Sequence, residues 1–172
     1  EDFLRTYTDL RDLGITNINV DLMYGIPYQT MDSFEKTLSE VSKLKPEHLS
    51  VYGLILEEGT PFFDCKEDLP IPKEDTECDM YELACKTLEQ SGYSHYEISN
   101  YAKPGYESRH NKKYWNSKEF IGVGLSAYSY LDGKRFGNTK DLRKYLSGSG
   151  FSEYCDIIDP ETEKYEYAML AL

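Results

Sequence analysis

The chain has 172 residues, a length typical of one domain, and 40% of them are hydrophobic, which is enough for a packed core. Its net charge of −12 argues against a general nucleic-acid or anionic-membrane surface, because both need clustered Lys and Arg. No run of about 18 apolar residues and no signal-type segment occurs, so we expect no membrane span and a cytoplasmic location.

Two further features of the composition bear on the class of protein. The chain starts at Glu1, and residues 165–172 resemble an unfinished helix, so we expect a piece of a longer protein. The four cysteines have no C-x-x-C or other metal-ligand spacing; they are Cys65, Cys78, Cys85 and Cys155. Reduced thiols and no metal site are therefore the expectation.

The first predicted elements are a helix and a strand. Apolar residues recur at helical spacing over residues 3–13, and Gly14 closes this helix. Residues 18–24 alternate between apolar and polar, as in a half-buried strand. Its polar face carries Asp21, whose charge needs either a structural hydrogen-bond partner or a ligand cavity. Gly25 and Pro27 end the strand in a loop, where α/β folds place ligands, and this favours the cavity.

A helix and a second strand follow. Thr30 is a good N-cap, and Pro46 stops the helix. Four apolar residues lie on one face of this helix: Phe34, Leu38, Val41 and Leu44. Residues 49–56 alternate again as a second strand. Two strands joined by a helix through short loops predict a βαβ unit with parallel pairing.

The middle of the chain continues this order. Residues 57–72 are predicted to be a turn and a polar loop, residues 73–91 a long helix, and residues 93–98 a short strand. A buried stripe on the long helix is expected at Tyr81, Ala84, Cys85 and Leu88. The fold class is α/β, with a wound or barrel-type sheet.

After Asn100 the pattern changes. A glycine-studded apolar stretch, 120–130, is predicted as a strand that turns at Asp132-Gly133. The remaining predicted elements are a loop at 101–106, a returning strand at 134–136, a short helix over 141–146 capped by Asn138-Thr139, a flexible link at 147–150 and a final helix opened by Pro160.

Strand alternation brings one group of candidate residues together. Asp21 and Met23 project to the same side as Tyr52 and Leu54 of the neighbouring strand. They form a polar-anchored apolar slot, suited to a ligand with one hydroxylated part and one flat part. Ordinary barrel lining explains the same pattern.

Two other groups are candidates for chemistry. His95-Tyr96-Glu97 with Ser99-Asn100-Tyr101 lies at a strand end, and is either a site or a turn rich in hydrogen bonds. His110-Asn111 beside Tyr114-Trp115 either ligates or stacks on a flat cofactor, or is a satisfied core or loop histidine. The sequence contains no G-x-S-x-G, G-x-G-x-x-G or P-loop motif.

Several stretches together resemble the radical S-adenosylmethionine (SAM) proteins related to oxygen-independent coproporphyrinogen III oxidase. The stretches are residues 21–27 with Gln29-Thr30, 46–52, 58–62 and 96–102. His110-Asn111-x-x-Tyr114-Trp115 is similar to the signature of the haem chaperone branch, HemW. The resemblance covers roughly residues 1–147; each motif alone is weak, and together they are specific.

The resemblance implies a fold and a chemistry. The fold is an incomplete (β/α) barrel, of which residues 1–105 would be the C-terminal part, with residues 106–172 starting a small α+β accessory region. In the family a [4Fe–4S] cluster, bound by a Cys-x3-Cys-x2-Cys motif, cleaves SAM reductively to a 5′-deoxyadenosyl radical. In the oxidase this radical takes a hydrogen from a propionate of coproporphyrinogen III, which loses carbon dioxide to become vinyl. In the chaperone branch the protein passes haem to haem-requiring proteins.

The resemblance also assigns roles to residues. Asp21 would hold the hydroxyl or amine groups of SAM. Met23, Tyr52, Leu54 and the backbone at Ile55 would line the nucleoside pocket. His110 is a candidate haem contact, without being fixed as the axial ligand.

One departure from the family pattern is large. The cluster motif is absent, so the ligands of the cluster would lie outside this chain, which alone should neither build the cluster nor cleave SAM. The motifs favour a haem chaperone over an oxygen-independent coproporphyrinogen III oxidase. Haem or coproporphyrinogen III, and a haem-accepting protein, are the implied partners; the sequence sets neither the acceptor nor the oligomeric state.

Overall fold

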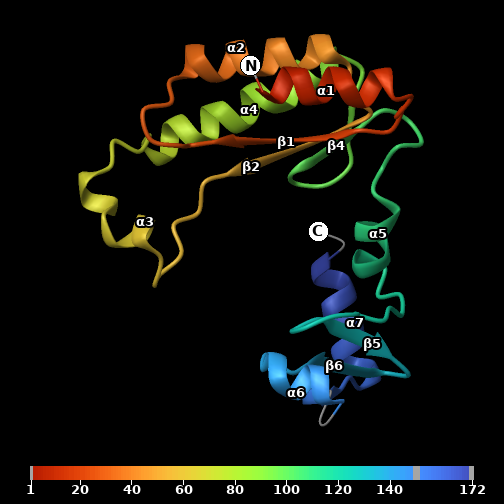
Figure 1. Ribbon diagram of the computed structural model, residues 1–172. Helices are drawn as coiled ribbons and strands as arrows, with labels where there is room; N and C mark the ends of the chain where they lie inside the picture. Colours follow the sequence, from red (N-terminus) through yellow and green to blue (C-terminus); the bar gives the residue numbers. More distant parts are fainter. Residues whose placement is uncertain (1, 149–151, 171–172) are drawn as a thin grey trace. The chain divides into compact units, whose positions relative to one another are not determined.

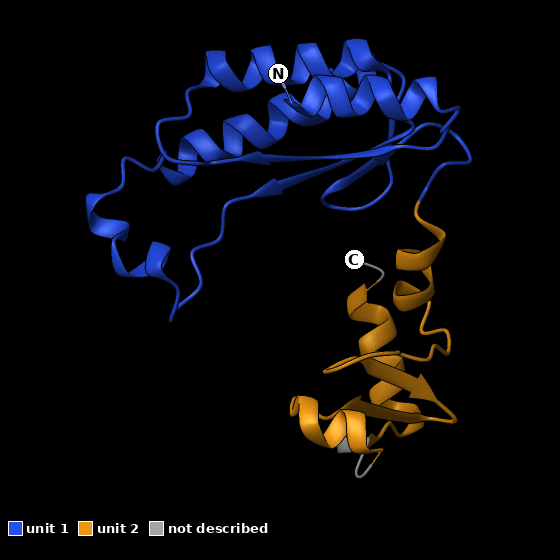
Figure 2. Ribbon diagram, viewed as in Figure 1, with its two compact units in different colours: residues 1–107 blue, residues 108–172 orange. Residues whose placement is uncertain are grey.

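The computed structural model describes residues 2–148 and 152–170, and the chain divides into two compact units, residues 1–107 and 108–172 (Figure 2). Of the link predicted at residues 147–150, the last two residues lie outside the described part. No helix among the described residues is long and apolar enough to cross a membrane.

Unit 1 is a small sheet covered on one face by helices. Its sheet has the strand order β1-β2-β4-β3, in which β1 and β2 are parallel, and β4 is antiparallel to both β2 and β3. In Figure 1 the three long helices lie on the same side of β1 and β2. The elements are α1 (Asp2–Asp12), β1 (Asn19–Tyr24), α2 (Met31–Leu44), β2 (His48–Gly53), α3 (Pro61–Asp64), a 3-10 turn (Lys66–Asp68), α4 (Glu74–Gln90), β3 (Ser94–His95) and β4 (Asn100–Ala102).

Both ends of α2 follow the predicted signals. The hydroxyl of Thr30 accepts a hydrogen bond from the N–H of Ser33, and the Ser33 hydroxyl accepts one from the N–H of Thr30, which is a capping box. At the other end Lys45 adopts a left-handed conformation with φ 54°, and Pro46 prevents further helix. The parallel βαβ unit predicted from the sequence is therefore confirmed.

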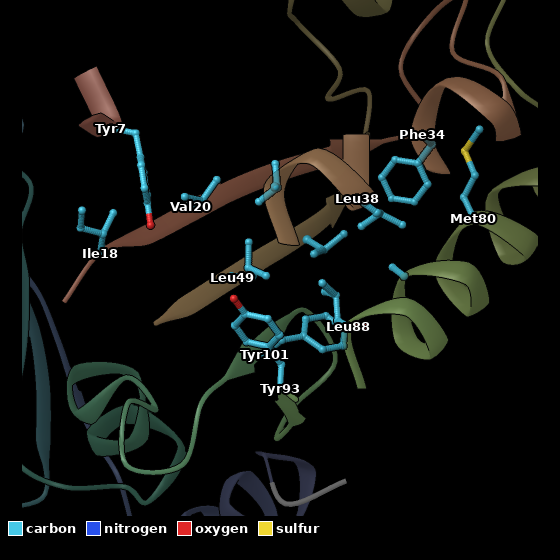
Figure 3. Packing of buried hydrophobic residues seen from close by; sticks show 13 residues of the cluster. Tyr7, Ile18, Val20, Phe34, Leu38, Leu49, Met80, Leu88, Tyr93 and Tyr101 are labelled. Atoms are coloured by element: carbon cyan, nitrogen blue, oxygen red, sulfur yellow. The ribbon is translucent and has the colours of Figure 1, made fainter. Parts of the chain in front are cut away.

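The core of unit 1 lies between the helices and the sheet (Figure 3). Phe34 and Leu38 of α2 are fully buried, as are Leu49 of β2 and Leu88 of α4. Each such side chain contributes about 1.5–3 kcal/mol by leaving water. On α4 the fully buried stripe is Met80, Ala84 and Leu88, whereas the predicted members Tyr81 and Cys85 are only partly buried.

Glu47 joins three elements of unit 1, beside the start of β2. Its carboxylate lies 2.7 Å from Nη2 of Arg11 in α1 and 3.4 Å from Nζ of Lys103 just after β4. It also accepts a hydrogen bond from the N–H of Ile18, which precedes β1. Burial raises the pKa of Glu47, but the hydrogen bonds from Arg11 and Ile18 and the two positive charges outweigh it, so this pKa lies below its usual value.

Several predictions for unit 1 are wrong in part. Residues 93–98 do not form one strand: the chain turns back at Glu97, so that β3 and β4 form a hairpin, and Tyr101, predicted in a loop, lies in β4. Hydrogen bonds from the N–H of Ser99 and the side chain of Asn100 to the Glu97 carboxylate hold this turn. In the predicted polar loop, Thr60 caps the short helix α3 by accepting from the N–H of Phe63.

Unit 2 contains an antiparallel sheet with the order β5-β6-β7. Arg135 of β6 makes a bidentate ion pair with Glu166 of α7, at 3.1 and 2.6 Å, which fastens this helix to the sheet. The elements of unit 2 are α5 (Arg109–Trp115), β5 (Tyr128–Leu131), β6 (Lys134–Asn138), α6 (Leu142–Ser147), β7 (Ser152–Ile157) and α7 (Pro160–Leu170).

Unit 2 also corrects the sequence predictions. Only Tyr128–Leu131 of the glycine-studded stretch is a strand, because Gly122 and Gly124 donate their N–H groups to side chains, Ser129 Oγ and Tyr145 OH, instead of to a neighbouring strand. The cap of α6 is Asp141, which accepts from the N–H groups two and three residues later, and not Asn138-Thr139. The predicted turn at Asp132-Gly133 and the helix opened by Pro160 are confirmed.

Candidate functional site

The candidate site lies on the face of the unit 1 sheet that the helices leave uncovered. The register pairs Asn19 with His48, Asp21 with Ser50, and Met23 with Tyr52, so each pair lies on the same face. Val20 and Leu49, at alternate positions, belong to the core on the opposite face. We call the side without helices the open face; its residues are Asn19, Asp21, Met23, His48, Ser50, Tyr52, Tyr96 and Asn100. Of these, His48, Ser50 and Asn100 are buried.

Asp21 combines features of the two interpretations made from the sequence, a structural hydrogen-bond partner and a ligand contact. It is exposed on the open face, and its Oδ1 atom accepts a hydrogen bond of 2.7 Å from Nδ2 of Asn19. Among the described residues, Oδ2 of Asp21 accepts no hydrogen bond. One carboxylate oxygen is thus held by the protein, and the other can accept from a hydroxyl or amino group of a ligand.

Two large side chains, Met23 and Tyr52, lie on the same face of the sheet as Asp21. Met23 and Tyr52 are paired in register and are 47% and 41% exposed, although both are large apolar side chains. Beyond β2, the N–H of Leu54 donates to the carbonyl of Tyr24, and the side chain of Ile55 is 81% exposed. The structure therefore places Asp21, Met23 and Tyr52 on one face of two parallel strands, and Leu54 and Ile55 follow the carboxyl end of β2, the end of a strand at which α/β folds bind ligands.

Gly25 gives the loop after β1 its shape. Its φ of 74° is left-handed, and a Cβ at this position would lie 3.1 Å from Oε1 of Glu77 in α4. Glycine therefore permits both the backbone turn and the close approach of α4 at the end of the strand.

His48 is the main residue of the open face that the sequence analysis did not select. Although polar, it is only 7% exposed. Its Nδ1 lies 2.6 Å from Oδ1 of Asn19, and its Nε2 lies 2.6 Å from the hydroxyl of Tyr96. Burial lowers the pKa of His48, and the nearby carboxylates of Asp21 and Glu97 oppose this shift without cancelling it. Burial therefore favours the neutral imidazole.

The second predicted group is divided between the two faces of the sheet. Tyr96 and Asn100 lie on the open face with His48 and Ser50. His95 instead stacks on Tyr101 at 4.3 Å between ring centroids, and the Tyr101 hydroxyl lies 3.2 Å from Sγ of Cys85 in α4. Strand alternation could have predicted the face on which His48 lies, because His48 precedes Ser50 by two residues. Its burial, however, depends on the β3–β4 hairpin.

His110 belongs to unit 2, whereas Asp21 belongs to unit 1. It lies in α5, is exposed, and its Nε2 is 3.0 Å from the hydroxyl of Tyr114. Tyr114 in turn contacts Phe120, with ring centroids 4.5 Å apart. Of the predicted group, His110 and Tyr114 contact each other one turn apart on α5.

The residues of this chain do not fit an iron–sulfur cluster. All four cysteines are free, and in residues 2–148 and 152–170 no group of three or more His, Cys, Asp or Glu side chains could hold a metal ion. A cluster of this kind needs several thiolates around one site.

Comparison with curated proteins identifies relatives. The chain is 39% identical over 142 residues to a haem chaperone HemW of Lactococcus lactis, covering 81% of this chain and 38% of the relative. It is 37% identical over 169 residues to a HemW of Bacillus subtilis, covering 95% and 44%. A mitochondrial radical SAM domain-containing protein 1 of Danio rerio is 37% identical over 127 residues, covering 73% and 29%. The chain spans about two fifths of the length of the HemW proteins.

Comparison with solved structures gives the fold. Coproporphyrinogen III oxidase (HemN) of Escherichia coli, described as a radical SAM enzyme, matches with a TM-score of 0.79 over 96% of this chain and 42% of that chain, at 22% identity. No family model matches. The resemblance and the fold class predicted from the sequence are confirmed: the chain is HemW-like, and it folds like part of coproporphyrinogen III oxidase.

Proposed function

We propose that the chain is part of a haem chaperone of the HemW type, which binds SAM, a [4Fe–4S] cluster and haem. The observation that carries this proposal is the 37% identity to a haem chaperone over 95% of the chain. The motif His110-Asn111-x-x-Tyr114-Trp115 adds support: it lies within α5, where His110 and Tyr114 contact each other.

We propose that the open face binds SAM. Asp21 would accept hydrogen bonds from the hydroxyl or amino groups through the oxygen that Asn19 does not occupy. Met23, Tyr52 and Leu54 would line the nucleoside, with the backbone at Ile55 beside it. When bound, SAM supplies the radical chemistry typical of the family. The chain's own residues bind it, orient it and cover its apolar part.

We propose a haem contact within this chain, but no ligand of the cluster. The described residues do not fit a cluster, so the cluster ligands would lie outside this chain. We propose His110 as a haem contact, supported by its exposure and its aromatic neighbour Tyr114. We further propose that residues 1–105 are the C-terminal part of the barrel and residues 106–172 the start of the accessory region, which agrees with the division of the chain after residue 107.

Oxygen-independent coproporphyrinogen III oxidase is the second candidate function, favoured by the fold match alone. The test uses the complete protein, reconstituted anaerobically and given coproporphyrinogen III, SAM and a reductant. We expect no protoporphyrinogen by chromatography and porphyrin fluorescence, and we expect haem to stay on the protein through gel filtration. Turnover to protoporphyrinogen would establish the oxidase and refute the chaperone.

Two variants test the proposed residues. Asp21→Asn should weaken SAM binding about tenfold or more, because a charge-assisted hydrogen bond, worth roughly 1.5–3 kcal/mol, is lost. His110→Ala should reduce haem retention while leaving SAM binding unchanged. Unchanged haem retention would show that His110 is not a haem contact.

A further inference from the structure

We propose that His48 is a positioning residue for the SAM site, and that it orients the Asp21 carboxylate by fixing the side-chain amide of Asn19. This inference rests on the proposed function of the open face. His48 itself touches no ligand, because both of its ring nitrogens already contact protein atoms, Oδ1 of Asn19 and the Tyr96 hydroxyl.

The hydrogen bonds fix which way the Asn19 amide points. An ionised carboxylate only accepts hydrogen bonds, so the amide atom facing Asp21 must be the NH2 group. The carbonyl oxygen then faces Nδ1 of His48 at 2.6 Å and the hydroxyl of Ser50 at 3.4 Å. A rotated amide would place its oxygen against the carboxylate, which is repulsive. The contacts on both sides of Asn19 therefore select one orientation.

The same contacts fix the tautomer of His48. Because Oδ1 of Asn19 accepts, Nδ1 of His48 carries the proton, and Nε2 is left to accept from the Tyr96 hydroxyl. The charged groups facing the ring are Asp21 of β1 and Glu97 of the β3–β4 turn, and burial favours the neutral ring in spite of them. His48 is thus held at both nitrogens, and its buried ring forms a fixed support beneath an exposed amide.

For the ligand, the important atom is Oδ2 of Asp21. Asn19 holds Oδ1 of Asp21, and Oδ2 accepts no hydrogen bond from the described residues. The row Tyr96–His48–Asn19–Asp21 therefore fixes the direction in which Oδ2 points. Without this support, the exposed carboxylate would lose rotamer freedom when SAM binds, and binding would be weaker.

The experiment measures the Kd for SAM in the complete, reconstituted protein by calorimetry. His48→Asn keeps a donor at the position of Nδ1 and loses only the contact with Tyr96. His48→Gln keeps a polar group at the position of Nε2 and loses the donor to Asn19. We expect the Kd of His48→Asn to stay within about twofold of wild type, and that of His48→Gln to rise about fivefold, equivalent to about 1 kcal/mol.

A double-mutant cycle tests the route through Asn19. Asn19→Ala should raise the Kd about fivefold, and adding His48→Gln to it should cause no further change. Asn17→Ala, an exposed asparagine two residues earlier, is the matched control and should bind SAM like wild type. Equal, additive effects in both backgrounds would overturn the proposal, because His48 would then act independently of Asn19.

The outcomes separate this inference from the proposed function. If Asp21→Asn weakens SAM binding but His48→Gln and Asn19→Ala do not, the SAM site stands and the positioning role fails. If Asp21→Asn binds SAM like wild type, the proposed site itself is wrong. Thermal unfolding identifies variants that fail to fold. Should His48→Gln be one of them, Asn19→Ala decides alone, since its side chain is exposed, and a wild-type Kd would overturn the proposal.

Discussion

Removing the Glu47 carboxylate should destabilise unit 1, and the contacts of this carboxylate predict by how much. Its side chain is only 12% exposed, whereas those of Arg11 and Lys103 are 26% and 32% exposed, so water screens the cations in part. The two ion pairs together are worth about 1 kcal/mol at such positions. The hydrogen bond from the N–H of Ile18 to the carboxylate contributes about 1.5 kcal/mol. Glu47→Ala should therefore lower the free energy of unfolding by about 2–3 kcal/mol.

Urea denaturation followed by far-UV circular dichroism measures this change. For a chain of this size the midpoint should fall by about 1–2 M in Glu47→Ala. Glu47→Gln is the matched control: it keeps an acceptor for Ile18 but loses the charge, so about 1 kcal/mol is expected.

The pH dependence provides a second test of Glu47. Its pKa in the folded protein lies below the ordinary 4.5, so its stabilising effect is present above pH 4.5 and is lost as the pH falls through the folded-state pKa. The difference between wild type and Glu47→Gln should shrink over that range. Two results would refute the assignment of about 1 kcal/mol to the charge of Glu47. One is equal destabilisation by Glu47→Gln and Glu47→Ala; the other is a difference in stability between wild type and Glu47→Gln that does not depend on pH.

Three further predictions concern unit 1. Leu38→Ala, at a fully buried site in α2, should cost about 2–5 kcal/mol, measured by urea denaturation; a loss below 1 kcal/mol would contradict the packing. Gly25→Ala should destabilise by about 1–2 kcal/mol, because φ is 74° and Glu77 lies close, and a more stable variant in thermal melts would contradict this. The pKa of His48 is lower in the folded protein than its ordinary value of 6.5, so its contribution to stability is complete above pH 6.5 and decreases as the pH falls below 6.5. His48→Asn should therefore flatten a curve of stability against pH below pH 6.5.

The elements that could be predicted from the sequence are those specified by local patterns. Thr30, the apolar face of α2 and Pro46 define the helix between two alternating strands without any distant contact. The same alternation placed Asp21, Met23 and Tyr52 on one face, and their register in the structure agrees. Whether these residues bind SAM stays a prediction.

The parts that could not be predicted depend on how distant segments meet. The β3–β4 hairpin follows from hydrogen bonds within the turn at Glu97, which period-two patterns do not reveal. Because that turn brings Tyr96 to His48, the burial of this histidine was not visible in its own strand. Likewise, the glycine-rich segment before β5 bonds to side chains such as Tyr145, 21 residues from its partner Gly124.

The strand order of unit 1 makes its two edges unequal. At one end, β3 is only two residues long, and the antiparallel β4 separates it from the parallel pair. At the other end, β1 has six residues, and in the described part of the chain no strand pairs with its outer side. Such an edge is a template for an added strand. β1 is therefore the longer template of the two edges, and a strand added beside it would place a new row of side chains next to Asp21.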